Sequence, residues 1–283
     1  MARFKSFFFV SLFVFFSCQK EVKNKSEDFT KENLFTNGIE GPAVDSKGNL
    51  YAVNFKEQGT IGLVNKKGIP SLFVKLPKGS VGNGIRFDTD DNMYIADYTN
   101  HTILLIKKGT KKAIIYAQDS TLNQPNDIAI APNGTLYASD PNWKEKTGKL
   151  WLIKNRKFVL LEKNMGTTNG IEVSPNGKKL YVNESVQRII WVYDIHSDGT
   201  IHNKQLFAQF QDFGLDGMRC DDNGNLFVCR YNKGTVIVLS PEGKKIREII
   251  LKGKKPSNIT FSNDKKQCFV TLADRGCFEL FNN

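Results

Sequence analysis

The chain has 283 residues, enough to bury the core of one large domain or two small ones. Lysine and arginine number 40 against 29 aspartates and glutamates, which gives a formal net charge of +11. A basic balance can indicate nucleic-acid binding, but here the lysines are scattered through turn sequences such as "NKKG", "IKKGTKK" and "LKGKK". Solvated hairpin turns explain this pattern, with an anionic membrane surface or an anionic substrate as the alternative, and no nucleic-acid partner is expected.

The first residues have the pattern of a secretory signal. Arg3 and Lys5 precede an apolar run over 7–16 that is too short to span a bilayer, and Ser17 and Cys18 follow it. A cysteine at this point resembles a bacterial lipoprotein signal. Residues 1–17 are therefore predicted to be the signal peptide, and Cys18 the lipidated first residue. A secreted protein with a free Cys18 is the alternative.

Residues 18–32 are charged and nearly free of aromatic residues, which predicts a flexible tether before a folded domain over 33–283. The expected location is the cell envelope. The protein is expected to be lipid-anchored, in the outer membrane of a Gram-negative bacterium, with a secreted or periplasmic protein as the alternative. The membrane would be contacted only through the anchor, and a monomer is expected.

Six copies of one pattern then follow, each an alternating apolar run, a turn rich in Asp, Asn, Gly or Pro, and a second run. The copies begin at Glu40, Asn83, Asn126, Asn169, Asp216 and Ser257. Successive starts are 43, 43, 43, 47 and 41 residues apart. Two runs around a short turn predict a β-hairpin, and further runs complete four strands in each copy. A repeat of this length without helical periodicity is typical of a propeller blade.

The fold class expected is therefore all-β, a six-bladed β-propeller with four antiparallel strands in each blade. After "QCFVTLA" and "GCFELFN" the last copy has no residues left for a fourth strand. The segment "FTKENLFT", residues 29–36, is predicted to supply that strand and close the ring. Four cysteines lie in the last two copies, at Cys220, Cys229, Cys268 and Cys277. They are interpreted as small buried residues, with disulfide pairing left open.

Two columns of polar residues recur at equivalent positions of the copies. The first strand of a blade lines the central channel, so the residues that begin the copies should form one ring there. A second column, at the end of each second strand, consists of Asn54, Asp97, Asp140, Glu184, Arg230 and Leu272. A ring of convergent oxygens favours a hard cation or bound water over a dry core. Calcium is the metal expected, with magnesium, manganese or zinc as substitutes.

At this point the sequence resembles the regucalcin, gluconolactonase and senescence-marker family of six-bladed propellers, over about residues 37–283. The resemblance is carried by "EGP" in the first copy, "ND" in the third, "NG" in the fourth and "DG" in the fifth. In that family these positions hold one divalent cation. The resemblance therefore implies a metal site at Glu40, Asn126, Asn169 and Asp216. The three histidines all fall in expected outer strands or turns.

The resemblance also implies hydrolysis of a lactone or another small ester, with the cation polarising the carbonyl group. It points to Asp216 as both ligand and base. Asp127 is a second candidate base, provided that the strand begins irregularly there. Asn83, Asp97, Asp140, Glu184 and Arg230 are predicted to contact substrate. Trp143, Trp151 and Trp191 are expected to pack within the blades, with a sugar-stacking surface as the alternative, and Trp143 follows Asp140 of the second column. Two other functions remain open: a binding platform held by a structural cation, and a phosphotriesterase or arylesterase.

Overall fold

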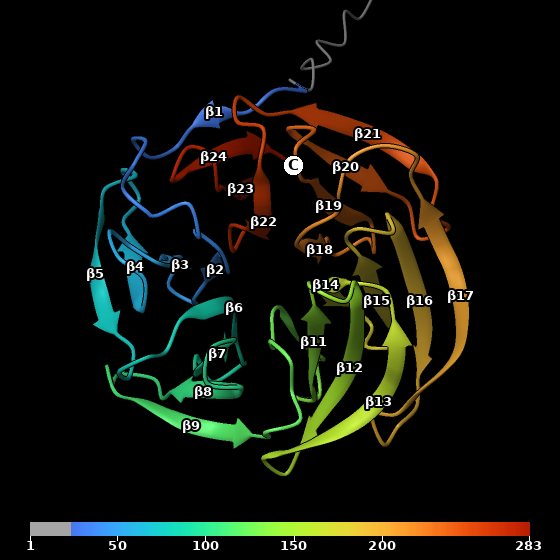
Figure 1. Ribbon diagram of the computed structural model, residues 1–283. Coiled ribbons are helices and arrows are strands. Elements are labelled where there is room, and N and C mark those ends of the chain that lie inside the picture. Colours follow the sequence, from blue (N-terminus) through green and yellow to red (C-terminus); the bar gives the residue numbers. More distant parts are fainter. Residues whose placement is uncertain (1–23) are drawn as a thin grey trace, which may run out of the picture.

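Six four-stranded antiparallel sheets are arranged around a central axis in this computed structural model, which describes residues 24–283 (Figure 1). The predicted signal peptide, Cys18 and the beginning of the expected tether lie outside these residues. Five sheets run outward from the channel in chain order, and the outermost strand of the sixth comes from the N-terminal part of the chain, so the fold is the six-bladed β-propeller predicted from the repeat. Within residues 24–283 no helix is long and apolar enough to cross a membrane.

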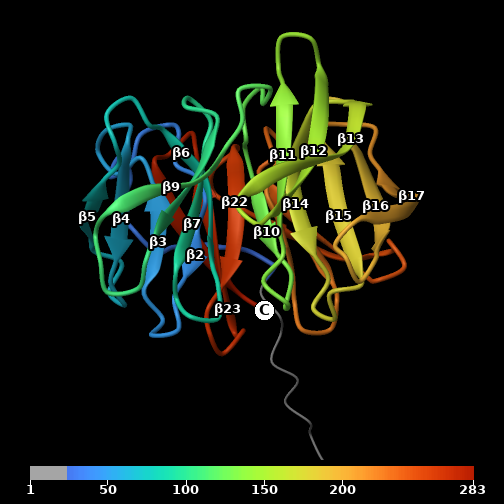
Figure 2. The same ribbon diagram turned by 90° about the horizontal axis from the view of Figure 1, so that it is seen from below.

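The strands of the first three blades follow the first three copies of the repeat. Blade 1 contains β2 (Ala43–Val44), β3 (Leu50–Val53), β4 (Thr60–Val64) and β5 (Pro70–Lys75). Blade 2 contains β6 (Gly82–Phe87), β7 (Met93–Asp97), β8 (Thr102–Ile106) and β9 (Ala113–Gln118). Blade 3 contains β10 (Ile128–Ile130), β11 (Leu136–Asn142), β12 (Thr147–Lys154) and β13 (Lys157–Met165). The β11–β12 hairpin rises above the ring in side view (Figure 2).

The remaining strands complete the ring. Blade 4 contains β14 (Thr168–Val173), β15 (Lys179–Glu184), β16 (Ile189–Ile195) and β17 (Ile201–Gln209). Blade 5 contains β18 (Met218–Cys220), β19 (Leu226–Arg230), β20 (Thr235–Leu239) and β21 (Lys245–Ile250). Blade 6 contains β22 (Pro256–Phe261), β23 (Gln267–Leu272), β24 (Cys277–Asn282) and, from the other end of the chain, β1 (Glu27–Asp28).

An N-terminal strand closes the ring, but it lies upstream of the predicted segment 29–36. Strand β1 pairs with β24 through Glu27 opposite Leu280 and Asp28 opposite Glu279. Part of the expected tether therefore belongs to the propeller. The predicted segment continues this contact, because Phe35 packs edge-on against Phe278. The prediction placed this strand too late in the chain, because a strand of only two residues at a sheet edge has no periodic pattern in the sequence.

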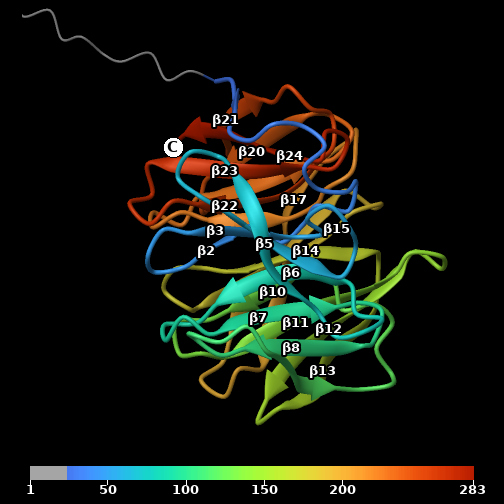
Figure 3. The ribbon, with the colours of Figure 1, turned by 90° about the vertical axis from the view of Figure 1, so that its left-hand side faces the viewer.

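The core lies between blades, where apolar side chains of one sheet pack on the next. Val53 and Ile61 of blade 1, for example, pack with Ile85 and Ile95 of blade 2, and all four are fully buried. Alternating strands place these residues inward and leave polar residues in the turns. The four cysteines named above are free thiols; three are buried and Cys220 is half-buried. This stack of sheets is visible from the side in Figure 3.

Candidate functional site

The six residues that begin the repeats meet at one end of the channel, as their shared position predicts. Glu40, Asn83, Asn126, Asn169, Asp216 and Ser257 all line a cavity of about 320 Å³. The cavity also contacts Trp143 in the β11–β12 hairpin, so it opens on the face that we call the upper face, at the top of Figure 2. The rest of the lining includes Asn37, Tyr231 and Ser185, and none of the lining residues is a lysine or an arginine.

Irregular strand starts place these side chains in the cavity. Glu40, Asn126 and Asp216 come just before strands β2, β10 and β18. Asn83 and Asn169 instead lie within β6 and β14, at points where the pairing register shifts. Such bulges re-aim side chains, and they are common beside functional sites. Regular alternation therefore does not govern side-chain direction at the level of the ring.

The glycine that follows several ring residues has a steric cause. A Cβ atom on Gly84 would lie 2.6 Å from Oδ1 of Asp127, and one on Gly217 would lie 2.0 Å from Cγ of Asn258. Both contacts are shorter than any side chain tolerates. The "NG" and "DG" pairs therefore combine a polar residue for the cavity with a glycine that lets the next blade approach.

Amide groups orient the two carboxylates of the cavity. Nδ2 of Asn169 donates to Oδ1 of Asp216 at 2.8 Å, which leaves the carbonyl oxygen of that amide for a ligand. Nδ2 of Asn258 donates to Oε2 of Glu40 at 3.0 Å. Burial, reinforced by the nearby Asp127, raises the pKa of Glu40 to about 7. Burial and the neighbouring Glu40 raise the pKa of Asp216 well above its usual value.

A second layer of charged residues fills the channel below the cavity. Nη1 of Arg86 lies 3.2 Å from Oδ1 of Asp127, and its Nη2 lies 3.4 Å from Oε2 of Glu172. Arg219 lies 3.4 Å from the same glutamate oxygen and reaches across to donate to the carbonyl oxygen of Pro42. Two acids and two guanidinium groups thus compensate each other, as buried charges require.

The carboxylates that line the cavity are not compensated by positive charges in this way. Neither Glu40 nor Asp216 forms an ion pair with any residue in the described part of the chain, so two negative charges remain at this level. Two carboxylates with amide oxygens nearby suit a divalent hard cation. No three or more His, Cys, Asp or Glu side chains cluster at metal-binding distances within residues 24–283, so amides must supply the other ligands. The residues present fit the cation that the sequence predicted.

Asp127 belongs to the second layer and does not line the cavity. Its strand does begin irregularly, because β10 starts only at Ile128. Its carboxylate accepts hydrogen bonds from the Ile128 amide at 2.9 Å and from Asn258 at 3.3 Å, in addition to the contact with Arg86. Burial raises the pKa of Asp127, and Arg86 opposes this rise. The predicted role of this residue as a base stays a prediction.

The charged residues of the second column lie away from the cavity, and only Asn83 of the five predicted substrate contacts lines it. Asp97 accepts hydrogen bonds from Val81 and Thr99, and Asp140 accepts them from the amides of Asn123 and Gln124.

Glu184 of the same column accepts a hydrogen bond from Nε1 of Trp191. The Arg230 side chain is only 1 % exposed and donates to Asp212 at 2.6 Å. These four charged groups hold loops and blade edges together. Their predicted contact with substrate stays a prediction.

Two features of the site were not anticipated, and a third, the position of Trp143, differs from the preferred interpretation of the sequence. Asn258, next to the ring residue Ser257, links Glu40 to Asp127. Trp143 is 42 % exposed and lines the cavity instead of packing within a blade. The charged layer had a signal in the sequence, because Arg86, Glu172 and Arg219 each lie three residues after a ring residue. None of the three histidines lines the cavity.

Comparison with known proteins gives matches over most of the chain. Residues 38–274 match the family described as SMP-30/Gluconolactonase/LRE-like region. The gluconolactonase of Zymomonas mobilis is 27% identical over 217 residues, which cover 68% of this chain and 60% of that protein. The diisopropyl-fluorophosphatase of Loligo vulgaris is 26% identical over 276 residues, covering 86% and 88%.

Solved structures show the same fold. A calcium-binding protein, regucalcin, from Agrobacterium tumefaciens superimposes with a TM-score of 0.79 at 19% identity, over 91% of this chain and 94% of that one. A gluconolactonase from Xanthomonas campestris gives a TM-score of 0.75 at 19% identity, over 90% and 87%. Identities this low bear on the architecture alone.

Proposed function

Because the chain belongs to the SMP-30/gluconolactonase/LRE-like family, we propose that it is a calcium-dependent hydrolase of cyclic esters. Relatives named gluconolactonase, 6-deoxy-6-sulfogluconolactonase and diisopropyl-fluorophosphatase support a hydrolase. The observation that carries the proposal is the pair of uncompensated carboxylates, Glu40 and Asp216, among amide side chains in an open cavity. A cation bound there would act as a Lewis acid on a carbonyl oxygen.

The residues of the cavity have separate roles. Glu40, Asn126, Asn169 and Asp216 would hold the metal, and Asn258 keeps Glu40 turned toward it. One oxygen of Asp216 is held by Asn169, while the other takes the proton of the attacking water. A bound cation would keep this buried carboxylate ionised, so that it can accept the proton. Water adds to the carbonyl carbon, the ring C–O bond breaks, and the leaving oxygen takes up a proton to give a hydroxy acid.

The cavity suits an uncharged substrate with a flat face. A second cleft of about 210 Å³ shares Glu40, Asn83, Asn126 and Trp143 with the cavity and extends it to Gln58, Tyr98 and Gln124. Neither space is lined by a basic residue. An exposed indole beside amide groups can stack on a ring while the amides bind hydroxyl groups. A neutral lactone with several hydroxyl groups matches this lining.

Metal removal tests the proposal. We expect chelation to abolish hydrolysis in a panel of sugar and aliphatic lactones, and added calcium to restore it. Asp216→Asn should lower kcat at least about 100-fold with the fold retained, because a general base is lost. Glu145→Gln removes an exposed acid in the β11–β12 turn, outside the cavity, and should leave kcat near wild type. Activity that survives chelation, or a fully active Asp216→Asn protein, would refute the mechanism.

Two other functions are tested by the same panel. The similarity to the squid diisopropyl-fluorophosphatase over most of both chains favours a phosphotriesterase as the second candidate, so a phosphotriester and an aryl ester are included. Calcium binding without turnover of any ester would indicate a binding platform.

We also propose that the protein acts in the cell envelope, anchored through Cys18. That residue lies outside the described part of the chain, and the proposal rests on the signal-like sequence before it. Labelled palmitate should be incorporated into the wild-type chain and not into Cys18→Ser. Equal labelling of both proteins would exclude this anchor.

A further inference from the structure

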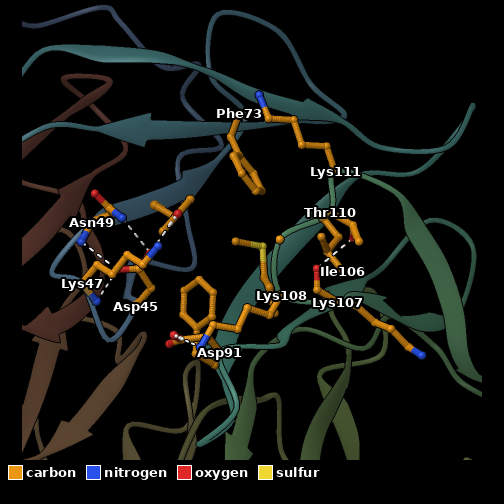
Figure 4. Close-up of a pocket in the computed structure, with 14 residues that line it drawn as sticks. Asp45, Lys47, Asn49, Phe73, Asp91, Ile106, Lys107, Lys108, Thr110 and Lys111 are labelled. Atoms are coloured by element: carbon orange, nitrogen blue, oxygen red, sulfur yellow. Dashed lines mark hydrogen bonds and ion pairs between the residues drawn. The ribbon is translucent and has the colours of Figure 1, made fainter.

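A separate cleft lies between blades 1 and 2, away from the channel (Figure 4). Its volume is about 270 Å³. Tyr51, Phe73 and Phe87 form an apolar floor, with ring centroids 5.1 Å and 5.3 Å from that of the tyrosine. Met93 and Ile106 complete this floor. The cleft is therefore built like a small binding site for an apolar group, although it contributes nothing to the channel.

Four lysines line the cleft, and three of them have no acidic partner in the described part of the chain. Lys47, Lys107 and Lys111 line the cleft and are exposed, and none of them forms an ion pair with a described residue. Nζ of Lys111 instead lies 5.6 Å from the centroid of the Phe73 ring (Figure 4). The cleft thus combines unpaired positive charge with apolar surface.

The two acids of the cleft do not cancel this charge. Asp45 accepts hydrogen bonds from the amides of Lys47 and Asn49 and from the hydroxyl of Tyr51. Asp91 accepts hydrogen bonds from Ser46 and pairs with Lys108 at 3.2 Å. Asp45 is engaged within its own turn and Asp91 by two neighbouring turns, so the three lysines remain free to bind an anion.

The cleft opens on the face opposite the candidate active site. It is formed by the β2–β3, β6–β7 and β8–β9 turns, which lie at the lower side of the ring in Figure 2 and define the lower face. The β4–β5 turn of blade 1 lies on the same face. It carries Lys66 and Lys67 beside Ile69, which is 59 % exposed. An exposed isoleucine among lysines suits the interface between lipid headgroups and acyl chains.

We propose that the lower face binds an anionic phospholipid membrane, with the cleft taking a headgroup and the first part of an acyl chain. Charge complementarity favours this occupant, because lysines near a negative leaflet each contribute to attraction within a Debye length. Nucleic acid fits less well: Tyr51 is only 6 % exposed, so its ring is too recessed for a base to stack on. Docking by this face turns the candidate active site away from the membrane, toward soluble substrate.

Vesicle binding tests the proposal. The chain without its predicted signal peptide, residues 18–283, carries Cys18→Ser, so that neither the apolar run over 7–16 nor an acyl chain contributes. It is sedimented with phosphatidylcholine vesicles with and without phosphatidylglycerol. The combined variant Lys47→Gln, Lys107→Gln and Lys111→Gln should bind the anionic vesicles on the order of 100-fold more weakly.

A matched control carries the same loss of charge on the upper side of the ring. It combines Lys78→Gln, Lys163→Gln and Lys254→Gln, which change exposed lysines outside the cavity. We expect it to bind like the unsubstituted chain, and both variants to keep the same melting temperature and lactone hydrolysis. Three results would overturn the proposal: an equal loss of vesicle binding in the two variants, equal binding of the unsubstituted chain to neutral and anionic vesicles, or tighter binding to a DNA duplex than to vesicles.

Discussion

Replacing Glu40 by glutamine should stabilise the metal-free protein, although it removes a predicted metal ligand. Burial and Asp127 raise the pKa of Glu40 from 4.5 to about 7, and hydrogen bonds from Gly41 and Asn258 oppose this rise only in part. Between these two values the folded state retains a proton that the unfolded chain has released. The free energy of unfolding of the metal-free protein therefore falls as the pH rises through this window.

The magnitude follows from that shift. A difference of about 2.5 pKa units corresponds to about 3 kcal/mol, and water in the open cavity should reduce it to about 2 kcal/mol. At pH 8 the chelated Glu40→Gln protein should be more stable than chelated wild type by about this amount. At pH 4 the carboxyl group is largely protonated in both states, so the difference should vanish.

Urea denaturation of the chelated proteins at both pH values measures this effect. Repeating it with calcium provides the internal control, because a bound ion stabilises the folded state according to its affinity. Calcium should stabilise wild type more than Glu40→Gln, since the variant has lost a charged ligand. A chelated Glu40→Gln protein that is less stable than wild type at pH 8 would show that the charge is compensated, and the metal site would lose its main support.

Four further substitutions test other parts of the structure. Trp143→Ala should raise KM for a six-membered sugar lactone about tenfold, with kcat and the hydrolysis of a small aliphatic lactone unchanged; a lower kcat with constant KM would argue against stacking. Asn258→Ala should weaken calcium binding about tenfold in calorimetry, because Glu40 loses its orienting donor; unchanged affinity would exclude that role. Phe35→Ala should lower the free energy of unfolding by about 3 kcal/mol, since the ring is buried against Phe55 and Phe278; a loss below about 1 kcal/mol would show that the N-terminal segment does not secure the ring. Burial raises the pKa of Glu248, but hydrogen bonds from Lys245, Thr235 and Lys233 lower it to about 2. Glu248→Gln should therefore lower the free energy of unfolding by about 1 kcal/mol at pH 7. Thermal melts should show a smaller difference as the pH falls toward 2.

The order of residues along the chain is enough to predict the architecture and the level of the site. A constant spacing of the hairpin pattern sets the number of blades, because each copy must stack on its neighbours to bury its apolar face. Equivalent positions in the copies must then lie at equivalent heights along the channel. For this reason the spacing of the copies alone places Glu40, Asn126, Asn169 and Asp216 around one cavity.

The orientation of these side chains and the compensation of their charges depend instead on how the blades pack together. Bulges at Asn83 and Asn169 break the regular alternation of side chains along a strand. The direction of a side chain therefore cannot be predicted from its position in the repeat. Arg86 neutralises Asp127 from another blade, which leaves Glu40 and Asp216 as the unpaired acids. Such pairs join residues far apart in the chain. The repeat pattern predicts the height of a residue along the channel, but it does not predict which residue pairs with it.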